Sequence, residues 1–167
     1  MKEHVLHPIP PLYDSKSRVL ILGSFPSVRS REQEFFYAHR QNRFWRVMAH
    51  LLSTPCPVSV EEKRHMLLSH GIALWDVIGA CEIEGSADSS IRSVVVNDIE
   101  RILKQAPVRR IFLNGKTAAH YYDLYLKDRI PIDAVCLPST SAANASWSLS
   151  DLTKAWGAAL LQDEIND

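Results

Sequence analysis

Cysteine is scarce in this sequence, and its apolar residues are not gathered into long runs. The three cysteines (Cys56, Cys81 and Cys136) are far apart and odd in number, so they predict neither a disulfide framework nor a zinc site. No apolar run approaches the roughly 18 residues that a membrane-spanning helix needs, and the first residues lack the apolar stretch of a signal peptide. We therefore expect a cytoplasmic protein with no membrane partner, no metal and no cofactor.

An overall excess of charge is also missing, since 19 Lys and Arg residues balance 19 Asp and Glu residues. This balance argues against a protein that coats nucleic acid without specificity. The charges are unevenly placed, however. Residues 28–48 carry five arginines and two glutamates, whereas residues 151–167 carry four acidic residues and one lysine. Such a distribution is compatible either with one cationic face or with ordinary solvated charge.

Four short apolar runs, at residues 19–22, 72–78, 110–113 and 134–137, predict buried strands. Each is followed by turn-forming or small residues and then by a helical pattern. Such alternation predicts an α/β fold in which helices cover both faces of a parallel sheet. The length suits a single domain over residues 1–167, with an extended arm at 1–17 because prolines there prevent a regular helix. No heptad or repeat indicates self-association, so we expect a monomer.

Capping residues indicate where several helices begin. Ser59 and Glu62 form a capping box, Asn97 is expected to cap a helix at 98–105, and Ser148 precedes the last helix. Trp156 lies on the apolar face of that last helix, so it is expected in the core.

The expected site lies at the loops that follow the strands, because an open parallel sheet binds its ligand beyond the carboxyl ends of its strands. The segment GSFPS at residues 23–27 does not match the G-x-S-x-G elbow of serine hydrolases, and no loop has the glycines of a phosphate cradle. A thiol triad of Cys136, His120 and Asn114 is disfavoured, because Cys136 is expected to pack inside a strand as a small apolar residue.

The side chains of these loops suit a planar polar ligand. Asn42 and Asn114 each offer an amide donor and acceptor to the edge of a nucleobase, although Asn42 could equally cap the helix that follows it. The rings available for stacking on a base are those of Phe25, Phe36, Tyr37 and Phe44. Contacts to backbone phosphates are expected from Ser139, Thr140, Ser141 and Asn144, with charge from Arg29, Arg31, Arg40 or Lys116.

Four motifs together resemble the uracil-DNA glycosylase superfamily: GSFPS at 23–27, Y-A-H-x-x-N-R-F-W at 37–45, L-N-G-K at 113–116 and L-P-S-T-S-A-A-N-A at 137–145. The resemblance covers residues 5–160 and is closest to the mismatch-specific and hypoxanthine-directed branches. It implies a three-layer αβα sandwich around a central four-stranded parallel sheet of order 2-1-3-4. The implied partner is damaged DNA, either duplex or single-stranded.

Two departures from the superfamily pattern bear on the substrate. Phe25 stands where the mismatch-specific branch has an asparagine, and Leu137 stands where many uracil-specific relatives have a histidine. The hypoxanthine-directed branch also lacks the first polar group and resembles this chain in the asparagine of its N-R-F-W motif, here Asn42. The resemblance therefore implies a monofunctional DNA-deoxyinosine glycosylase with Asn42 as the catalytic residue. The implied base contacts are Ser24, Phe25, Tyr37, His39 and Asn114, and the implied DNA contacts are Ser27, Arg40, Arg43, Lys116, Ser139, Thr140, Ser141 and Asn144.

One neutral amide suffices for this chemistry, because an oxocarbenium-like transition state needs an oriented water more than a strong base. The carbonyl oxygen of Asn42 is expected to hold that water, and Asn144 or Trp147 to fill the space that the base vacates. Two alternatives stay open. One is a glycosylase for uracil or mismatches. The other is a non-catalytic nucleic-acid-binding module on the same fold, which Phe25 and Leu137 would suit.

Overall fold

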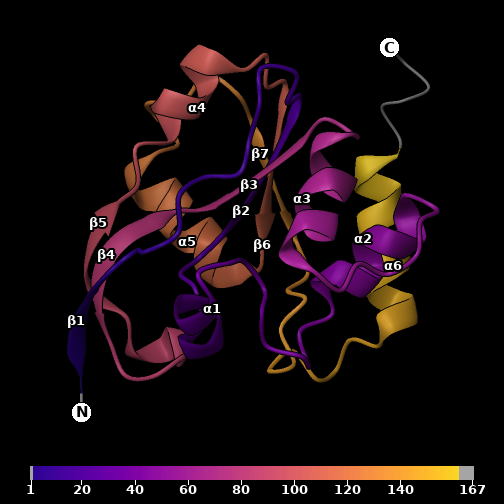
Figure 1. The fold of residues 1–167 in the computed structure, drawn as a ribbon. Coiled ribbons are helices and arrows are strands. Elements are labelled where there is room, and N and C mark those ends of the chain that lie inside the picture. Colours follow the sequence, from indigo (N-terminus) through magenta and orange to yellow (C-terminus); the bar gives the residue numbers. More distant parts are fainter. Residues whose placement is uncertain (1, 162–167) are drawn as a thin grey trace.

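A central sheet of four parallel strands organises the computed structural model, which describes residues 2–161 (Figure 1). The order of the strands is β3 (Ile72–Asp76), β2 (Val19–Gly23), β6 (Arg110–Asn114) and β7 (Ala134–Leu137). This is the predicted order 2-1-3-4, so the predicted fold is confirmed. Val19 is paired with Ile72 on one side and with Arg110 on the other, which places β2 and β6 at the centre of the sheet.

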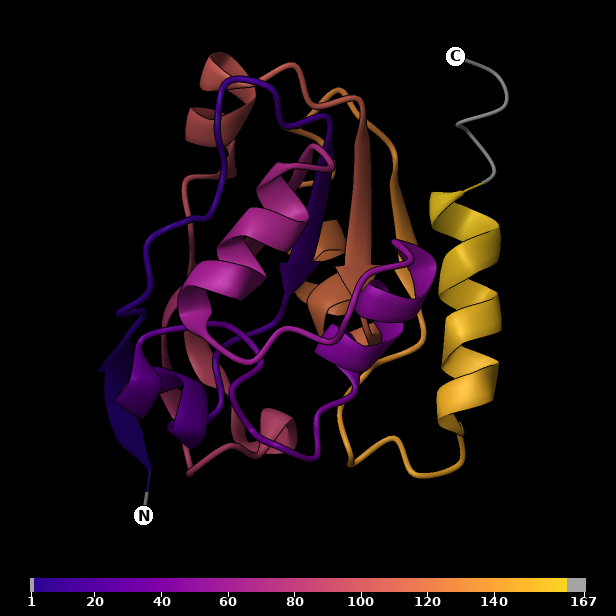
Figure 2. The same ribbon diagram turned by 45° about the vertical axis from the view of Figure 1, so that its right-hand side comes forward.

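Helices cover both faces of the central sheet, as the alternating pattern predicted. In Figure 2, α3 lies in front of the sheet and α5 lies behind it, and α2 packs against α6. The helices are α1 (Val28–Gln33), α2 (Phe44–Leu51), α3 (Val60–Leu68), α4 (Ile99–Gln105), α5 (Lys116–Tyr125) and α6 (Leu149–Leu160). None of the helices within residues 2–161 combines the length and the apolar character that crossing a membrane requires.

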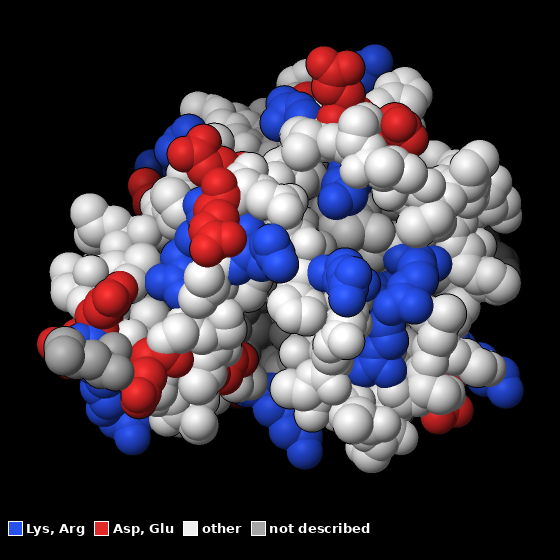
Figure 3. Space-filling model, turned by 60° about the horizontal axis from the view of Figure 1, so that its bottom comes forward, with Lys and Arg blue, Asp and Glu red and all other residues white. Residues whose placement is uncertain are grey.

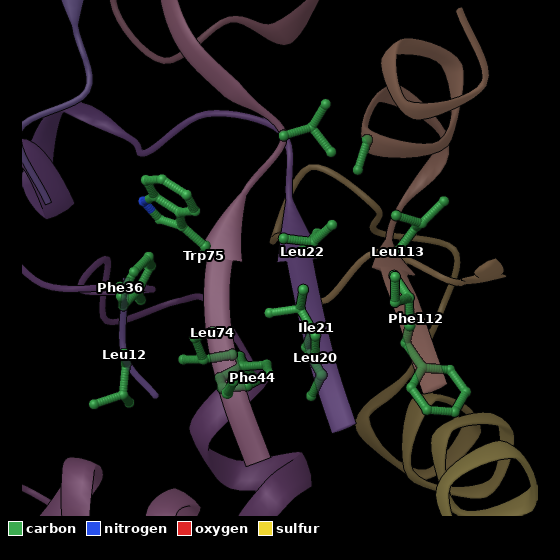
Figure 4. Packing of buried hydrophobic residues seen from close by; sticks show 14 of the residues in the cluster. Leu12, Leu20, Ile21, Leu22, Phe36, Phe44, Leu74, Trp75, Phe112 and Leu113 are labelled. Carbon is green, nitrogen blue, oxygen red and sulfur yellow. The ribbon is translucent and has the colours of Figure 1, made fainter. Parts of the chain in front are cut away.

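The core lies between these layers and explains why the strands could be recognised. All five residues of β3 are buried, and Leu20, Ile21 and Leu22 of β2 are fully buried (Figure 4). Strands that are buried on both faces have continuous apolar sequences rather than alternating ones. Trp156 is 0% exposed, in agreement with its predicted place in the core.

A second sheet, which the sequence analysis did not predict, is antiparallel and has the order β1 (Glu3–Leu6), β4 (Ile78–Ile83) and β5 (Arg92–Val96). The chain passes from β3 into β4 across Val77 alone, so one apolar run contains two strands in different sheets. Within the predicted extended arm, residues 3–6 form β1, which pairs with β4, and residues 2–17 contain no helix. The turn-forming residues expected directly after the run at 72–78 come later, because β4 continues to Ile83 and a 3₁₀ turn, η1, follows at Asp88–Ser90.

Two of the three predicted caps are present. Ser59 accepts from the backbone N–H of Glu62, and Ser148 forms a capping box with Asp151. The prediction for Asn97 is wrong, because Asp98 caps α4 instead. The amide of Asn97 donates to the carbonyl oxygens of Asp76 and Ile78 at 2.9 and 3.2 Å, which ties the second sheet to the end of β3. Of the predicted acidic tail, Asp163, Glu164 and Asp167 lie outside the described residues.

Candidate functional site

A cleft of about 1060 Å³ opens where the central strands end. The last residues of the four strands, Gly23, Asp76, Asn114 and Leu137, all line it, together with parts of the loops that follow. Figure 3 shows this end of the molecule, where Lys and Arg side chains lie on both sides of a hollow in the surface. The cleft is large enough for a nucleotide, and its position is the one that the order of the strands predicted.

Two carboxamides meet in the cleft through one hydroxyl group. Asn114 Nδ2 donates to Thr140 Oγ1 at 3.0 Å, and Thr140 Oγ1 donates to Asn42 Oδ1 at 2.8 Å. The backbone N–H of Thr140 also donates to Asn114 Oδ1 at 3.0 Å. Asn114 ends β6, Thr140 lies three residues after β7, and Asn42 lies two residues before α2. The network therefore joins three segments that are distant in sequence.

The amide of Asn42 has a defined orientation. Its Oδ1 also accepts from the backbone N–H of Phe44 at 2.9 Å, and this group can only donate, so the atom facing it must be oxygen. Asn42 therefore satisfies the first N–H of α2 and lines the cleft at the same time. Because Oδ1 already accepts twice, the expectation that it holds a water is corrected. The NH₂ group has no hydrogen-bond partner among residues 2–161 and remains available to a ligand.

Tyr37 and Phe25 form the apolar part of the cleft. One face of the Tyr37 ring packs on Phe44, with the ring centroids 4.2 Å apart. Its hydroxyl is buried and has no partner at hydrogen-bonding geometry among the described residues. Burial and the carboxylate of Asp76 raise the pKa of Tyr37 far above its ordinary value, whereas the nearby amide of Asn114 lowers it. The hydroxyl therefore stays protonated as a donor. Phe25 is 8% exposed and lines the cleft.

Gly23 is required for the close approach of these groups. A Cβ atom at Gly23 would lie 3.0 Å from the Tyr37 hydroxyl oxygen and closer still to Asp76 Oδ1. Tyr37 itself adopts a left-handed backbone conformation, with φ of 52°, which few non-glycine residues adopt. The polar tip of Tyr37 is thus held against the end of β2.

A buried pair of His7 and Asp76 lies beneath this part of the cleft, and the sequence analysis missed it. His7 Nε2 lies 2.7 Å from Asp76 Oδ2, with the two side chains 2% and 5% exposed. The backbone N–H of Ile9 donates to His7 Nδ1 at 3.2 Å, so the proton of a neutral imidazole is on Nε2 and is donated to Asp76. The residues are 69 positions apart, and no local pattern connects them.

Ser24 and Asp88 form another part of the cleft lining. Ser24 Oγ donates to the carboxylate of Asp88 at 3.2 and 3.3 Å. Partial burial raises the pKa of Asp88 above its ordinary value. The hydroxyls of Ser24 and Thr117 lower it, and the charge of Asp76 raises it. The loop that carries Asp88 is attached to α1, since the backbone N–H of Val28 donates to Ser86 Oγ at 2.9 Å.

Arg43 holds the loop at 138–147 in place. Its Nη2 donates to the carbonyl oxygens of Ser141 and Asn144 at 2.9 and 3.1 Å, its Nε donates to that of Thr140, and its Nη1 donates to that of Trp147. This geometry favours a structural role over the predicted phosphate contact. The prediction for Thr140 is also corrected, because this residue is 0% exposed and its hydroxyl is already bonded twice.

The other predicted contacts are spread along the cleft and beside it. His39 and Lys116 line the cleft and are exposed, whereas Arg40 is exposed but does not line it. Ser27 lines the cleft and caps α1. Ser139, Ser141 and Asn144 also line the cleft. Trp147 is 36% exposed there, which leaves its ring accessible.

Cys136 is exposed rather than packed inside its strand, which corrects that expectation. Partial burial of the sulfur and the charge of Asp123 raise the pKa of the thiol, against the opposite effect of Lys116. His120 packs on Tyr121, with ring centroids 4.9 Å apart, and does not line the cleft. The geometry therefore gives no thiol triad. Among the described residues, no group of three or more His, Cys, Asp or Glu is placed to hold a metal ion.

The fold and the cleft define a three-layer α/β protein that binds its ligand at the carboxyl end of a parallel sheet. Residues 10–162 match the family model of the Uracil DNA glycosylase superfamily, and the chain belongs to this superfamily.

Individual relatives are similar over most of the chain. A hypoxanthine DNA glycosylase from Methanosarcina acetivorans is 35% identical over 141 residues, which are 83% of this chain and 88% of the relative. A hypoxanthine DNA glycosylase from Methanosarcina barkeri is 28% identical over 152 residues, which are 90% of this chain and 94% of the relative. The solution NMR structure of a candidate uracil DNA glycosylase from Methanosarcina acetivorans matches with a TM-score of 0.75 and 32% identity, over 89% of this chain and 94% of that one.

Proposed function

We propose that this protein is a DNA glycosylase that takes deoxyinosine out of the helix and hydrolyses its N-glycosidic bond, leaving an abasic site. The observation that carries the proposal is the pair of carboxamides, Asn42 and Asn114, joined through Thr140 in the cleft. Two relatives with the name hypoxanthine DNA glycosylase support the choice of base. The protein would act as a monomer, on duplex or single-stranded DNA.

Binding would begin with the target nucleotide leaving the base stack. Unpairing and unstacking cost a few kcal/mol, and less for a poorly paired base such as hypoxanthine opposite thymine. Lys and Arg side chains beside the hollow would attract the phosphates (Figure 3). Contact with the rings of Tyr37 and Phe25 would return roughly 1–3 kcal/mol for the extruded base.

Hydrolysis would then depend on an oriented water rather than a strong base. The NH₂ group of Asn42 is free to donate to the water oxygen, which keeps a second lone pair for attack on the anomeric carbon. An amide does not remove a proton near neutral pH, but an oxocarbenium-like transition state asks little of the nucleophile. The negative charge on the departing base would be stabilised by nearby donors, the Tyr37 hydroxyl and the second N–H of Asn114. The departing base would finally take up one proton, which balances the proton that the attacking water loses.

The test is an excision assay on oligonucleotides that carry inosine, uracil or xanthosine, in duplex and single-stranded form, followed by hot alkali to cleave abasic sites. We expect strand breaks at inosine. Breaks at uracil alone would replace the proposed substrate with the one that the name of the structural relative suggests. Tight binding to inosine duplex without any abasic product, at high enzyme concentration and long incubation, would instead indicate a non-catalytic module.

A further inference from the structure

Among the described residues, the hydroxyl of Thr140 is the group that joins the carboxamides of Asn42 and Asn114. Its oxygen accepts from Asn114 Nδ2 at 3.0 Å and its hydrogen is donated to Asn42 Oδ1 at 2.8 Å. Thr140 is 0% exposed, its bond to Asn114 is buried, and its bond to Asn42 is partly buried. A buried chain of this kind is strong when each member is satisfied and is costly when one is not.

The directions of the bonds in this chain are fixed from one end. The N–H of Phe44 makes Asn42 Oδ1 an acceptor, so the hydrogen of the Thr140 hydroxyl must point to that oxygen. Its own oxygen is then the acceptor for Asn114 Nδ2. The chain Asn114 → Thr140 → Asn42 therefore has one arrangement of protons, and that arrangement leaves the NH₂ group of Asn42 for the ligand.

We propose that Thr140 is a positioning residue, whose hydroxyl keeps the NH₂ end of Asn42 directed at the substrate. This inference rests on the proposed function, because it concerns the same site. Rotation of an asparagine amide about its last torsion is only weakly restricted by its own geometry. Without the hydroxyl, one of the two bonds that hold Asn42 Oδ1 would be lost, and Asn114 Nδ2 would lose its acceptor.

The test compares Thr140→Val, which replaces the hydroxyl with a methyl group of similar size, with Thr140→Ser, which retains it. In single-turnover excision of an inosine duplex, we expect Thr140→Val to be about 10- to 100-fold slower, the scale of a misplaced catalytic group. We expect Thr140→Ser to stay within about 3-fold of the parent, and DNA affinity to change by less than about 3-fold in both. Equal losses in the two variants would overturn the proposal.

A double-mutant cycle separates positioning from a general structural effect. If Thr140 acts through Asn42, adding Thr140→Val to Asn42→Ala should slow excision by less than about 3-fold more. Losses that multiply would show that Thr140 acts independently of Asn42 and would overturn the inference.

A readout without catalysis keeps this inference separate from the proposed function. If the parent protein releases no hypoxanthine, the proposed function fails, and the side-chain amide signals of Asn42 and Asn114 in ¹⁵N NMR spectra still report on Thr140. We expect Thr140→Val to move both pairs of signals and Thr140→Ser to leave them near their parental positions. Unchanged signals in Thr140→Val would contradict the assigned network.

A different observation concerns the pair of Ser24 and Asp88. Asp76 and Asp88 are the acidic residues among the described ones that line the cleft, and the carboxylate of Asp76 is 5% exposed and paired with His7. Asp88 is exposed and accepts from Ser24 Oγ at long distances of 3.2 and 3.3 Å. It is thus the carboxylate that is free to exchange its partner for a ligand.

An acceptor beside a hydroxyl donor matches the edge that deamination creates. Adenine presents a lone pair at N1 and an amino group at C6, whereas hypoxanthine presents N1–H and a C6 carbonyl. We infer that Asp88 accepts from N1–H and that the Ser24 hydroxyl donates to O6, so that adenine would bring its N1 lone pair against a carboxylate. This inference also rests on the proposed function. A site whose acceptor pairs with a donor on the base discriminates strongly against a base that lacks this donor.

Binding without hydrolysis tests this inference. Duplexes carrying 2′-fluoroarabino forms of inosine or adenosine resist cleavage, and their ratio of Kd values measures discrimination. Asp88→Asn should reduce the preference for inosine about 10-fold or more, because an amide can donate to N1 of adenine. The cost of extruding each base is common to both proteins and cancels. An unchanged ratio would overturn the inference, whereas a changed ratio in a protein that cleaves neither base would refute only the proposed function.

Discussion

Two parts of the cleft lining are constructed in different ways. In one part Asn42, Asn114 and Thr140 form a hydrogen-bonded network, in which Thr140 is 0% and Asn114 8% exposed. In the other part Ser24 and Asp88 are joined by hydrogen bonds of 3.2 and 3.3 Å, and Asp88 is exposed. We call these the amide wall and the carboxylate wall.

The difference between the walls suggests a division of work. Groups that are fixed before the substrate arrives stabilise a transition state best, since no energy is spent on arranging them during the reaction. The amide wall meets this condition. A group that recognises a base must instead release its hydrogen-bond partner when the base binds. The long hydrogen bonds of the carboxylate wall allow such an exchange. The walls should therefore respond differently to substitution.

The largest effect is expected at Asn42. Asn42→Ala should lower the single-turnover rate about 10³-fold or more, the scale for removing one preorganised donor, while DNA binding is retained. Asn42→Asp sharpens the test, because it keeps an oxygen for Phe44 and Thr140 but replaces the NH₂ group; it should be nearly as slow. Gln33→Ala, at an exposed position of α1 outside the cleft, is the control and should stay near the parental rate. If Asn42→Asp were active, the group that holds the water would be the side-chain oxygen at this position rather than the NH₂ group.

Next in size is the effect of His7 on stability, because His7 and Asp76 form a buried pair at the end of β3. His7→Ala would leave the carboxylate of Asp76 buried without its 2.7 Å partner. We expect it to lower the free energy of unfolding by about 3 kcal/mol, as for other broken buried pairs. Urea unfolding measures this. His4→Ala, at an exposed position of β1, is the matched control, and equal behaviour of the two variants would mean that the pair contributes little.

A smaller effect is expected from Arg43, which orders the loop behind the amide wall. In Arg43→Lys the charge remains, but one ammonium group does not reach the four carbonyl oxygens that the guanidinium contacts. We expect about a 10-fold loss, roughly 1.4 kcal/mol, mainly in the affinity for inosine DNA. Arg40→Lys, at an exposed position outside the cleft, should bind like the parent. Equal weakening of the two variants would favour a direct phosphate contact by Arg43.

The strands of the central sheet and the position of the cleft could be predicted from the sequence, for a physical reason. Parallel strands are buried on both faces, so β2, β3, β6 and β7 have continuous apolar sequences. The carboxyl ends of such strands converge, which brought the predicted loops to one cleft. The motifs around Asn42 and Asn114 then indicated the chemistry.

The missed features depend on contacts between distant segments. The second sheet was hidden because the turn at Val77 lies inside one apolar run. Thr140 lies in a segment rich in serine and alanine that resembles an exposed loop, but it is 0% exposed and makes hydrogen bonds with Arg43, Asn42 and Asn114. The pair of His7 and Asp76 spans 69 positions. Local patterns carry no information on such pairings.

The smallest predicted effect is a change in the free energy of unfolding when Asp88 in the carboxylate wall is substituted. Partial burial and Asp76 raise the pKa of Asp88 above 3.8, so folding opposes its ionisation. The destabilisation is absent below the unfolded pKa, grows as the pH rises toward the raised value and is complete above it. Asp88→Asn should therefore stabilise the protein near pH 7.5, by less than about 1 kcal/mol because the residue is exposed.

This gain should shrink as the pH falls toward 4 in urea unfolding. Asp88→Asn could be more stable and yet discriminate less between inosine and adenosine. That result would mean that the carboxylate of Asp88 lowers the stability of the fold and serves recognition of the base. Loss of stability at neutral pH would instead make Asp88 a structural residue, and the contrast between the two walls would fail.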